Sequence, residues 1–445
     1  MSQVVKAIKF EKAKVDSLGQ PVKVVVGALL FTICFALSSA YPDKSVYLAI
    51  MTVIFLIDLS VRWKNIQSVV LLFVYMVTHA VMLVIFYGYD VHISFYKAFQ
   101  NDFYFSHVLR SLSFLIFVIW LFAFPSNSIN RKNFGLRQFF TPKPNRVLFF
   151  ASVSIMTFII VTGIAGESIF QSGGYGQGKT TRFMNLAIYE YFLIFFLMGF
   201  KYMKENLLSK LIMAVLVSLY VVKNLSFGGR IESLQLIIMI FILFLEGKFK
   251  YRVLLPLGLL LVVFLGLWGM FRGSVSSDLS ILYYLRRFNT LEVFATQSEV
   301  IYSSAVIQSL RIDSLYSQEE FLNMLVLFFV SVFVPSRFMP QEAYLTSVAR
   351  NVSGFGGGGL ISSYFNTWLG YFGVVFIGLW IAMLLNGLGR RRSQGFVVYQ
   401  IMVLSVYPRW FSYSPITMFK LSFYGVIVYF IFRFSEAIFA LRKES

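Results

Sequence analysis

The sequence predicts an all-α polytopic membrane protein. Its 445 residues are 58% hydrophobic and 18% aromatic, and the mean hydropathy is +0.75. A soluble protein of this size has no core that could bury so much apolar surface. The apolar residues also gather into stretches that are about as long as a membrane-crossing helix. Because no internal repeat or second domain is visible, residues 1–445 are expected to form one membrane domain.

About twelve stretches are predicted to be spans. They lie near 24–40, 45–61, 67–88, 105–125, 147–165, 184–200, 208–224, 231–246, 253–271, 364–386, 396–408 and 416–433. The first ends in Ser-Ser-Ala, which resembles a signal-cleavage site, but an uncleaved helix is the expectation. The apolar stretch 321–334 is short and is stopped by Pro335. It is therefore expected to be a re-entrant or interfacial helix.

The basic residues predict the topology, because loops on the cytoplasmic side are enriched in Lys and Arg. With the N-terminus inside, the inner segments hold 24 of the 39 Lys and Arg residues, the outer segments 12 and the spans 3. The net charge of +19 is then explained by orientation, and nucleic acid is not an expected partner. Both termini are expected in the cytoplasm, and the long segment 272–363 is expected to be an outer, periplasmic loop.

This loop contains six arginines and no lysine. They are Arg272, Arg286, Arg287, Arg311, Arg337 and Arg350. A guanidinium group binds phosphate through two parallel hydrogen bonds, which a lysine cannot do. We expect Arg287 to act on an anionic substrate and three others to bind it, namely Arg286, Arg337 and Arg350. Solvated charges on helices are the alternative. Thr296 to Glu299 has the spacing of a capping box, which predicts a helix near 297–310.

Arg230 follows two glycines at the outer end of one expected span and begins the next. Glycine lets the backbone approach a ligand closely, and Glu232 lies two residues further on. We expect Arg230 to contact the anionic substrate. Glu232, or Glu292 in the loop, is the candidate carboxylate that accepts a proton. An interfacial arginine that extends toward the lipid headgroups is the alternative.

The run from Gly173 to Thr180 matches the P-loop pattern G-x-x-x-x-G-K-T. It lies between two spans on the expected outer face, however, without the strand and nucleotide-binding fold that a P-loop requires. A flexible connector is the simpler interpretation. The other is that Lys179 and Arg182, together with backbone amides, touch the phosphate or sugar of a substrate.

Further ionisable residues lie in or near the expected spans, where they are functional candidates because burying them is costly. They are Asp58, Glu190, Lys223 and Lys420. The sole cysteine, Cys34, lies in the first span and the three histidines are scattered, so no metal or cofactor is expected. The expected inner loops are too short for a nucleotide-sugar transferase or ATPase domain. Tyr407-Pro-Arg409-Trp410 is similar to the Q-x-x-R-W motif of processive synthases but lacks the glutamine.

Taken together, these features resemble the O-antigen polymerases of bacterial envelopes, the Wzy family. The similarity rests on the span layout, the late outer loop, the Gly-Gly-Arg230 turn and the segment Val334 to Pro340. It also rests on Asn366, which begins a match to the family pattern Asn-x-x-x-Gly-x-x-Gly. The acidic residue that often precedes this asparagine is absent, since Tyr364 and two serines stand there.

The resemblance implies an all-helical membrane glycosyltransferase of the GT-C-like type that needs no metal. Its substrates would be oligosaccharides linked to undecaprenyl pyrophosphate, with Asn366 in the substrate site. The growing glycan would move to the non-reducing end of another lipid-linked repeat unit, on the periplasmic face of the inner membrane. Membrane lipids would surround the protein, and a chain-length regulator is a further family expectation.

Two alternatives are retained. The O-antigen ligases use the same donor but carry a histidine in the large outer loop, and residues 272–363 contain none. A flippase or exporter of lipid-linked glycans would also be basic and polytopic. It would place its cations in a cavity between spans and not mainly in one outer loop.

Overall fold

The computed structural model describes most of the chain. The described residues are 2–89, 101–125, 136, 144–162, 182–183, 186–204, 206–226, 229–249, 253–254, 256–258, 260, 290–353, 357–388 and 393–444. The expected span 253–271 and the expected P-loop-like run therefore lie largely outside these residues.

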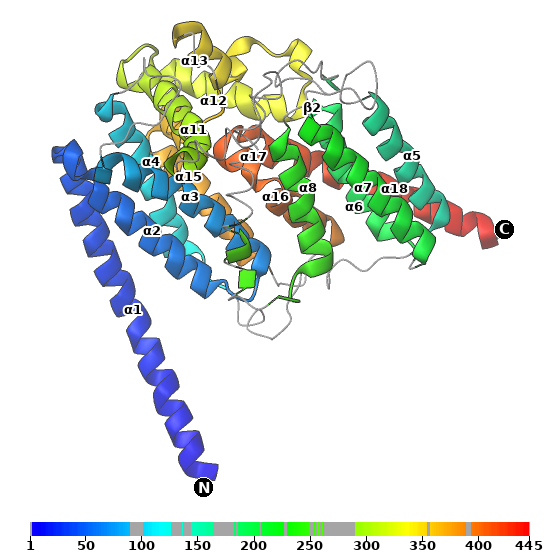
Figure 1. The fold of residues 1–445 in the computed structure, drawn as a ribbon, viewed down its shortest axis with the longest axis horizontal. Coiled ribbons are helices and arrows are strands. Elements are labelled where there is room, and N and C mark those ends of the chain that lie inside the picture. Colours follow the sequence, from blue (N-terminus) through cyan, green and yellow to red (C-terminus); the bar gives the residue numbers. More distant parts are fainter. Residues whose placement is uncertain are drawn as a thin grey trace.

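The described chain is almost entirely helical (Figure 1). Its α-helices are α1 (Ser2–Ala40), α2 (Ser45–Arg62), α3 (Gln67–Tyr89), α4 (Asp102–Phe122), α5 (Arg146–Thr162), α6 (Tyr191–Tyr202), α7 (Leu207–Ser226), α8 (Arg230–Ile240), α11 (Thr290–Ile312), α12 (Gln318–Phe333), α13 (Leu345–Ser353), α14 (Ile361–Leu369), α15 (Tyr371–Asn386), α16 (Gln394–Ser405), α17 (Tyr407–Ser412) and α18 (Ile416–Glu444). Two strands of two residues, β1 (Arg182–Phe183) and β2 (Leu186–Ala187), form an antiparallel pair.

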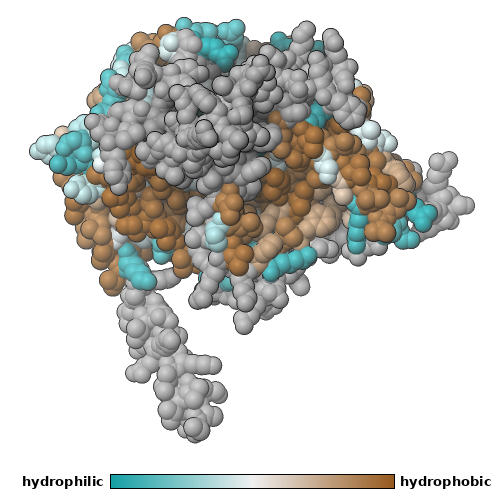
Figure 2. Space-filling model, viewed as in Figure 1, coloured by the Kyte–Doolittle hydropathy of each residue, from teal (hydrophilic) through white to brown (hydrophobic). Residues whose placement is uncertain are grey.

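Six helical stretches are long and apolar enough to cross a membrane, judged by length and composition. They are Pro21–Ala40, Pro42–Arg62, Gln67–Gly88, Asp102–Phe122, Leu207–Leu225 and Ile416–Ile438. Figure 2 shows hydrophobic residues forming a band across the molecule, with hydrophilic residues above and below it. A helical protein embedded in a membrane is the fold class that these observations support.

Other expected spans are shorter or interrupted in the structure. The expected span 364–386 is divided into α14 and α15 at Gly370, whose φ of 63° is a left-handed conformation that favours glycine. The expected span 184–200 contains β2 and a 3-10 helix, and its α-helix α6 has only 12 residues. The described residues thus contain six continuous spans of full length, and the number twelve stays a prediction.

The outer, periplasmic placement of 272–363 stays a prediction, but the middle of this segment packs as a buried helix. Residues 300–310 are all buried, and α11 packs against α3, α4 and α14 inside the helical bundle. The helix predicted near 297–310 is confirmed within α11, but it begins at Thr290, so the capping box expected at Thr296 is wrong. Hydropathy did not indicate the burial of this helix, because buried serines on it bond within the helix itself.

Two serines and a glutamine show how α11 is buried. Ser303 and Ser304 donate hydrogen bonds to carbonyl oxygens one turn earlier in the same helix, at 2.8 and 2.7 Å. Gln308 Nε2 donates to Ser111 Oγ on α4 at 2.7 Å and to Ser363 Oγ on α14 at 2.9 Å. The glutamine therefore joins three helices, and its burial does not leave this amide nitrogen unsatisfied.

The apolar stretch 321–334 forms the helix α12, which ends just before Pro335. A capping box begins it: Ser317 Oγ accepts from the Glu320 amide, and the Glu320 carboxylate accepts from the Ser317 amide. One face of α12 is buried against α14 and α18, and the other exposes large apolar residues, including Leu322 and Val326. This apolar outer face is suited to contact with lipid, and the re-entrant or interfacial placement stays a prediction.

Candidate functional site

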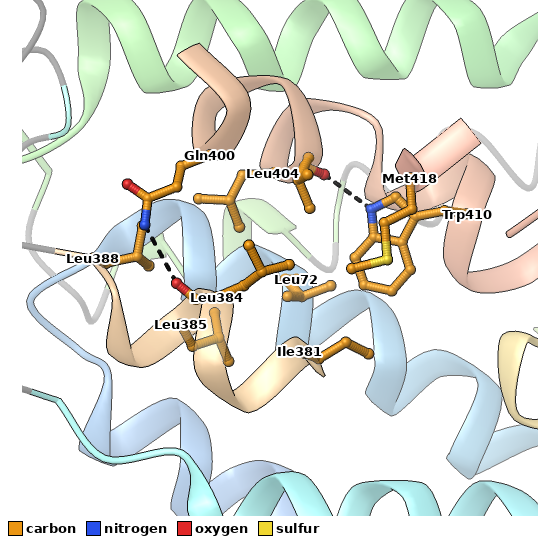
Figure 3. Close-up of a pocket in the computed structure, with 10 residues that line it drawn as sticks. Leu72, Ile381, Leu384, Leu385, Leu388, Gln400, Leu404, Trp410 and Met418 are labelled. Carbon is orange, nitrogen blue, oxygen red and sulfur yellow. Dashed lines mark hydrogen bonds between the residues drawn. The ribbon is translucent and has the colours of Figure 1, made fainter. Parts of the chain in front are cut away.

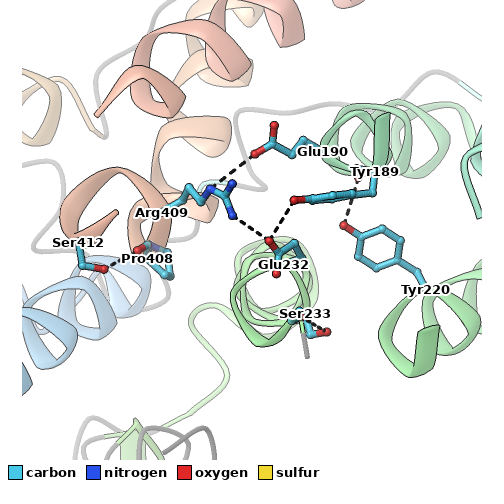
Figure 4. Close-up of polar contacts among 9 residues, drawn as sticks. Tyr189, Glu190, Tyr220, Glu232, Ser233, Pro408, Arg409 and Ser412 are labelled. Carbon is cyan, nitrogen blue, oxygen red and sulfur yellow. Dashed lines mark hydrogen bonds and ion pairs between the residues drawn. The ribbon is translucent and has the colours of Figure 1, made fainter. Parts of the chain in front are cut away.

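The strongest cluster of charged residues joins three segments that are far apart in the sequence (Figure 4). Arg409, in α17, places Nη1 2.8 Å from Glu232 Oε1 and Nε 3.7 Å from Glu190 Oε1. Glu232 lies in the first turn of α8, and Glu190 immediately precedes α6. The side chains of Glu190 and Glu232 are 6% and 11% exposed. Two nearly buried carboxylates therefore share one guanidinium group.

Tyrosines hold the carboxylate side of this cluster. The Tyr189 hydroxyl donates a hydrogen bond to Glu232 Oε1 at 3.2 Å, so that this oxygen accepts from both Tyr189 and Arg409. The Tyr220 hydroxyl in turn donates to the Tyr189 carbonyl at 3.1 Å (Figure 4), and its ring stacks on Phe192 at 4.1 Å between centroids. This packing ties α7 to the segment before α6 and orients the Tyr189 hydroxyl.

The turn before α8 explains why glycine precedes Arg230. The Gly229 amide donates to the Asn224 carbonyl at 2.7 Å, which closes the turn between α7 and α8. A Cβ at Gly229 would lie 3.0 Å from Glu232 Oε2 and 3.1 Å from the Asn224 carbonyl oxygen. The close approach expected at this position is therefore found, although the neighbours are the carboxylate and the backbone of the protein itself.

Arg230 is only 5% exposed, which argues against an arginine that extends outward to lipid headgroups. Its guanidinium hydrogen-bonds the Tyr413 side chain and interacts electrostatically with Tyr75 and Glu299. Tyr75 lies on α3 and shares a hydrogen bond of 2.7 Å with Ser412 Oγ. Arg230 thus belongs to the interior of the bundle, between α8, α3, α11 and the residue that follows α17.

Lys420 extends the cluster on the other side. This residue of α18 is 1% exposed, and its Nζ donates to the Ser331 carbonyl near the end of α12. It also interacts electrostatically with Glu190. Lys420 therefore balances part of the Glu190 charge while it holds α12 against α18.

The glycine run before α14 packs against other parts of the bundle. A Cβ at Gly358 would lie 2.4 Å from Tyr413 Cα, and one at Gly357 would lie 2.5 Å from Ser303 Oγ. Five of the six residues 354–359 are glycine, a composition that predicts a mobile or ligand-contacting loop for the stretch 353–359. The structure instead gives Gly357 and Gly358 a packing role, because any larger residue would push α11 and Tyr413 away.

Of the predicted site residues, Glu232 belongs to the charged cluster, and Arg230 lies two residues before it in the first turn of α8, where it interacts with Tyr413, Tyr75 and Glu299. Three others, Lys179, Arg286 and Arg287, lie outside the described residues. Only the backbone is described for Arg182, in β1, and for Glu292, in α11.

The remaining three predicted site residues lie elsewhere. Arg337 is exposed, with its guanidinium carbon 4.6 Å from the centroid of the Phe338 ring, and Arg350 is exposed on α13. Asn366 is 8% exposed within α14. Among the described hydrogen bonds and ion pairs, none joins Arg337 or Asn366 to the charged cluster.

Arg409 was missed as a site residue, and its tetrad Tyr407 to Trp410 was set aside because it lacks the glutamine of the synthase motif. A usable signal was present. Arg409 and Lys420 are the only charged residues between 393 and 432, and an ionisable group in such an apolar stretch is a functional candidate. The partners could not be read from the sequence, because Glu232 lies 177 residues away.

A small cavity lies next to this region but differs from it in character (Figure 3). Its volume of about 20 Å³ admits roughly one water molecule. The lining is apolar apart from Gln400, whose amide nitrogen points to the Leu384 carbonyl, and Trp410, whose indole nitrogen donates to the Val403 carbonyl. This cavity is too small and too apolar to hold a charged substrate.

The cluster combines what is needed to bind an anion and to accept a proton: guanidinium groups at the start of a helix, a nearby carboxylate and tyrosine hydroxyls. In the part of the chain that the structure describes, no three His, Cys, Asp or Glu side chains converge as metal ligands would. The chain matches no protein-family model, no curated protein and no solved structure.

Proposed function

We propose that this protein polymerises lipid-linked oligosaccharide repeat units. It would transfer the growing glycan from undecaprenyl pyrophosphate to the non-reducing end of another lipid-linked unit, as a metal-independent glycosyltransferase of the bacterial inner membrane. The observation that carries the proposal is the position of Arg230 and Glu232. They share the first turn of α8 inside the bundle, with Arg409 2.8 Å from the carboxylate.

This arrangement supplies the two groups that the reaction needs. As the acceptor hydroxyl oxygen bonds to the anomeric carbon of the donor, the bond from that carbon to the pyrophosphate oxygen breaks, and the pyrophosphate leaves with the electron pair. Guanidinium groups and the N-terminus of α8 stabilise the negative charge that develops on the leaving group. Glu232 accepts the proton that the acceptor hydroxyl loses.

The position of the cluster favours a reaction at one membrane surface. Glu190 directly precedes α6 and Arg230 is the first residue of α8, so both lie where helices begin. In Figure 1 this end of α8 lies near β2, at the same edge of the bundle as α12 and α13. A transferase needs access from only one side, whereas a transport route must continue through to the other.

Export or flipping of lipid-linked glycans is the second candidate, and one observation favours it. The clustered cations Arg230, Arg409 and Lys420 all lie on helices of the bundle, whereas Arg337 and Arg350 in the expected loop are exposed. A transporter would have cations between its helices in this way.

Deletion of the gene distinguishes a polymerase from a flippase. The measurement is a gel of the surface polysaccharide from the deletion strain. A polymerase deletion leaves lipid A–core that carries a single repeat unit, because ligation continues while polymerisation stops. Loss of every repeat unit would instead indicate a flippase or a ligase. Complementation with Glu232→Gln should leave the single-unit band, and the matched control Glu342→Gln, at an exposed glutamate, should restore the ladder.

A further inference from the structure

We infer that Arg409 is a pyrophosphate-binding residue that exchanges its contact with Glu232 for the substrate. In the structure, the guanidinium is held by two carboxylates. When the lipid pyrophosphate arrives, Arg409 would turn to it and leave Glu232 free to accept the proton of the acceptor. The inference rests on the proposed function, because it assigns the pyrophosphate to the same site.

The exposure of the three side chains gives the direction of approach. The Arg409 side chain is 29% exposed, against 6% for Glu190 and 11% for Glu232. An incoming anion therefore meets the guanidinium before it meets either carboxylate. Arg230, at 5% exposure, lies deeper, where its hydrogen bond to Tyr413 holds it.

The contact of Arg409 with the two carboxylates has the geometry that we propose for its contact with a pyrophosphate. Arg409 uses Nε toward Glu190 and Nη1 toward Glu232, so its planar group bridges oxygens from two separate anions. The two phosphates of a pyrophosphate offer oxygens that the same planar group can bridge. A lysine at this position would keep the charge but could not bridge in this way.

Both carboxylates retain a partner after the exchange, and this lowers the free-energy cost of the exchange. Glu232 keeps the hydrogen bond from Tyr189 at 3.2 Å, and Glu190 keeps its electrostatic interaction with Lys420. A buried carboxylate with no partner would oppose the exchange strongly. Here the cost is reduced to the loss of the two ion pairs with Arg409.

The backbone around Arg409 is held in place, so the exchange is a movement of the side chain. The Trp410 indole donates to the Val403 carbonyl at 2.9 Å, and Ser412 bonds Tyr75 at 2.7 Å. Gly358 packs directly on Tyr413. Turning the guanidinium requires only rotation about side-chain bonds, which is fast compared with catalysis.

Binding of farnesyl pyrophosphate to the purified full-length protein, in nanodiscs of zwitterionic lipid, tests the exchange without relying on polymer formation. We expect Arg409→Gln to bind about ten- to a hundredfold more weakly than the wild type, because a charge-assisted contact is lost. We expect Arg409→Lys to bind more weakly as well, although its charge is kept. Glu232→Gln should bind roughly two- to tenfold more tightly, because the competing ion pair is gone.

The matched control is Arg433→Gln, at an arginine that pairs with Glu436 within α18, and it should bind as the wild type does. Two competitors show whether the site binds a pyrophosphate or a lipid headgroup. They are inorganic pyrophosphate, added to the assay, and phosphatidylglycerol, included in the nanodiscs. Competition by pyrophosphate supports the site, whereas competition by the anionic lipid alone would show a headgroup site and overturn the inference.

Thermal unfolding of each variant separates binding from folding. Unchanged binding in Arg409→Gln and Glu232→Gln, with unfolding temperatures near that of the wild type, would show that the ion pair is only structural. If the binding pattern holds but the deletion strain lacks even the single repeat unit, the pyrophosphate site stands and the polymerase proposal fails.

Discussion

The Arg409 guanidinium lies 2.8 Å from the Glu232 carboxylate, although 177 residues separate the two in the chain. The contact fixes α17 against the first turn of α8, where Arg230 also lies. It places a cation and a carboxylate side by side within a bundle of apolar helices. Burying a pair of charged side chains costs free energy, so the position of Arg409 and Glu232 in the bundle indicates a function.

Replacement of Arg230 by lysine should abolish most polymer. Lysine keeps the charge but not the planar group that bonds Tyr413 and, in our proposal, the leaving pyrophosphate. A charge-assisted contact of about 1.5–3 kcal/mol, if made in the transition state, corresponds to roughly a ten- to a hundredfold loss of rate. The measurement is polymer formed per unit of membrane protein.

The control for this variant is Arg433→Lys, because Arg433 is half exposed and pairs with Glu436 one turn away on the same helix. Arg311, to which the sequence assigns no substrate role, is unsuitable as a control. Its Nη1 donates to the Thr367 carbonyl at 3.1 Å near the end of α14, so its loss would disturb folding. Wild-type chain lengths in Arg230→Lys at normal protein level would remove Arg230 from the site.

Labelling of single cysteines tests the predicted orientation, in a background where Cys34 is replaced by serine. Glu342→Cys, at an exposed position of the expected outer segment, should react with an impermeant thiol reagent in intact spheroplasts. Lys64→Cys, exposed between α2 and α3, should react only after lysis. The reverse pattern would invert the topology.

The burial of α11 can be tested in the same background. Ser303 is 2% exposed and lies in a segment that the sequence predicts to be a loop. Ser303→Cys should therefore stay unlabelled in both intact and lysed cells and should react only after denaturation. Reaction in intact spheroplasts at the rate of Glu342→Cys would show that Ser303 is accessible and would contradict the burial of α11.

Replacement of Gly358 by alanine tests the packing of the glycine run. A Cβ there would meet the Tyr413 backbone at 2.4 Å, so we expect a destabilisation of about 1–3 kcal/mol from overpacking. Gly199→Ala in α6 is the matched control, since its Cβ would make ordinary contacts of 3.4 Å with two methionines. Equal unfolding temperatures for the two variants would mean that the run does not pack as described.

Composition and hydropathy were enough to predict a helical membrane protein, because long apolar helices leave a strong local signal. They could not predict that α11 is buried in the bundle. Ser303 and Ser304 count as polar in any hydropathy scale, yet each hydroxyl is satisfied within its own helix. The left-handed conformation at Gly370, which divides one expected span, depends on tertiary packing in the same way.

The candidate site was predictable in part. Gly229, Arg230 and Glu232 are close in sequence, so a turn followed by two charges could be recognised. Arg409 and Glu190 reach the same place only through the packing of α17 and of the segment before α6, which leaves no trace in local spacing. The contribution of the loop arginines, Arg286 and Arg287, stays a prediction.

Reconstitution of the purified protein tests the central proposal most directly. The substrate is the lipid-linked repeat unit extracted from the deletion strain, supplied in proteoliposomes without nucleotide, without nucleotide sugar and with a metal chelator present. Our account predicts a ladder of lipid-linked oligomers with the wild-type protein and none with Glu232→Gln. A repeat unit that stays monomeric with correctly folded wild-type protein, or that only moves between the leaflets, would contradict it.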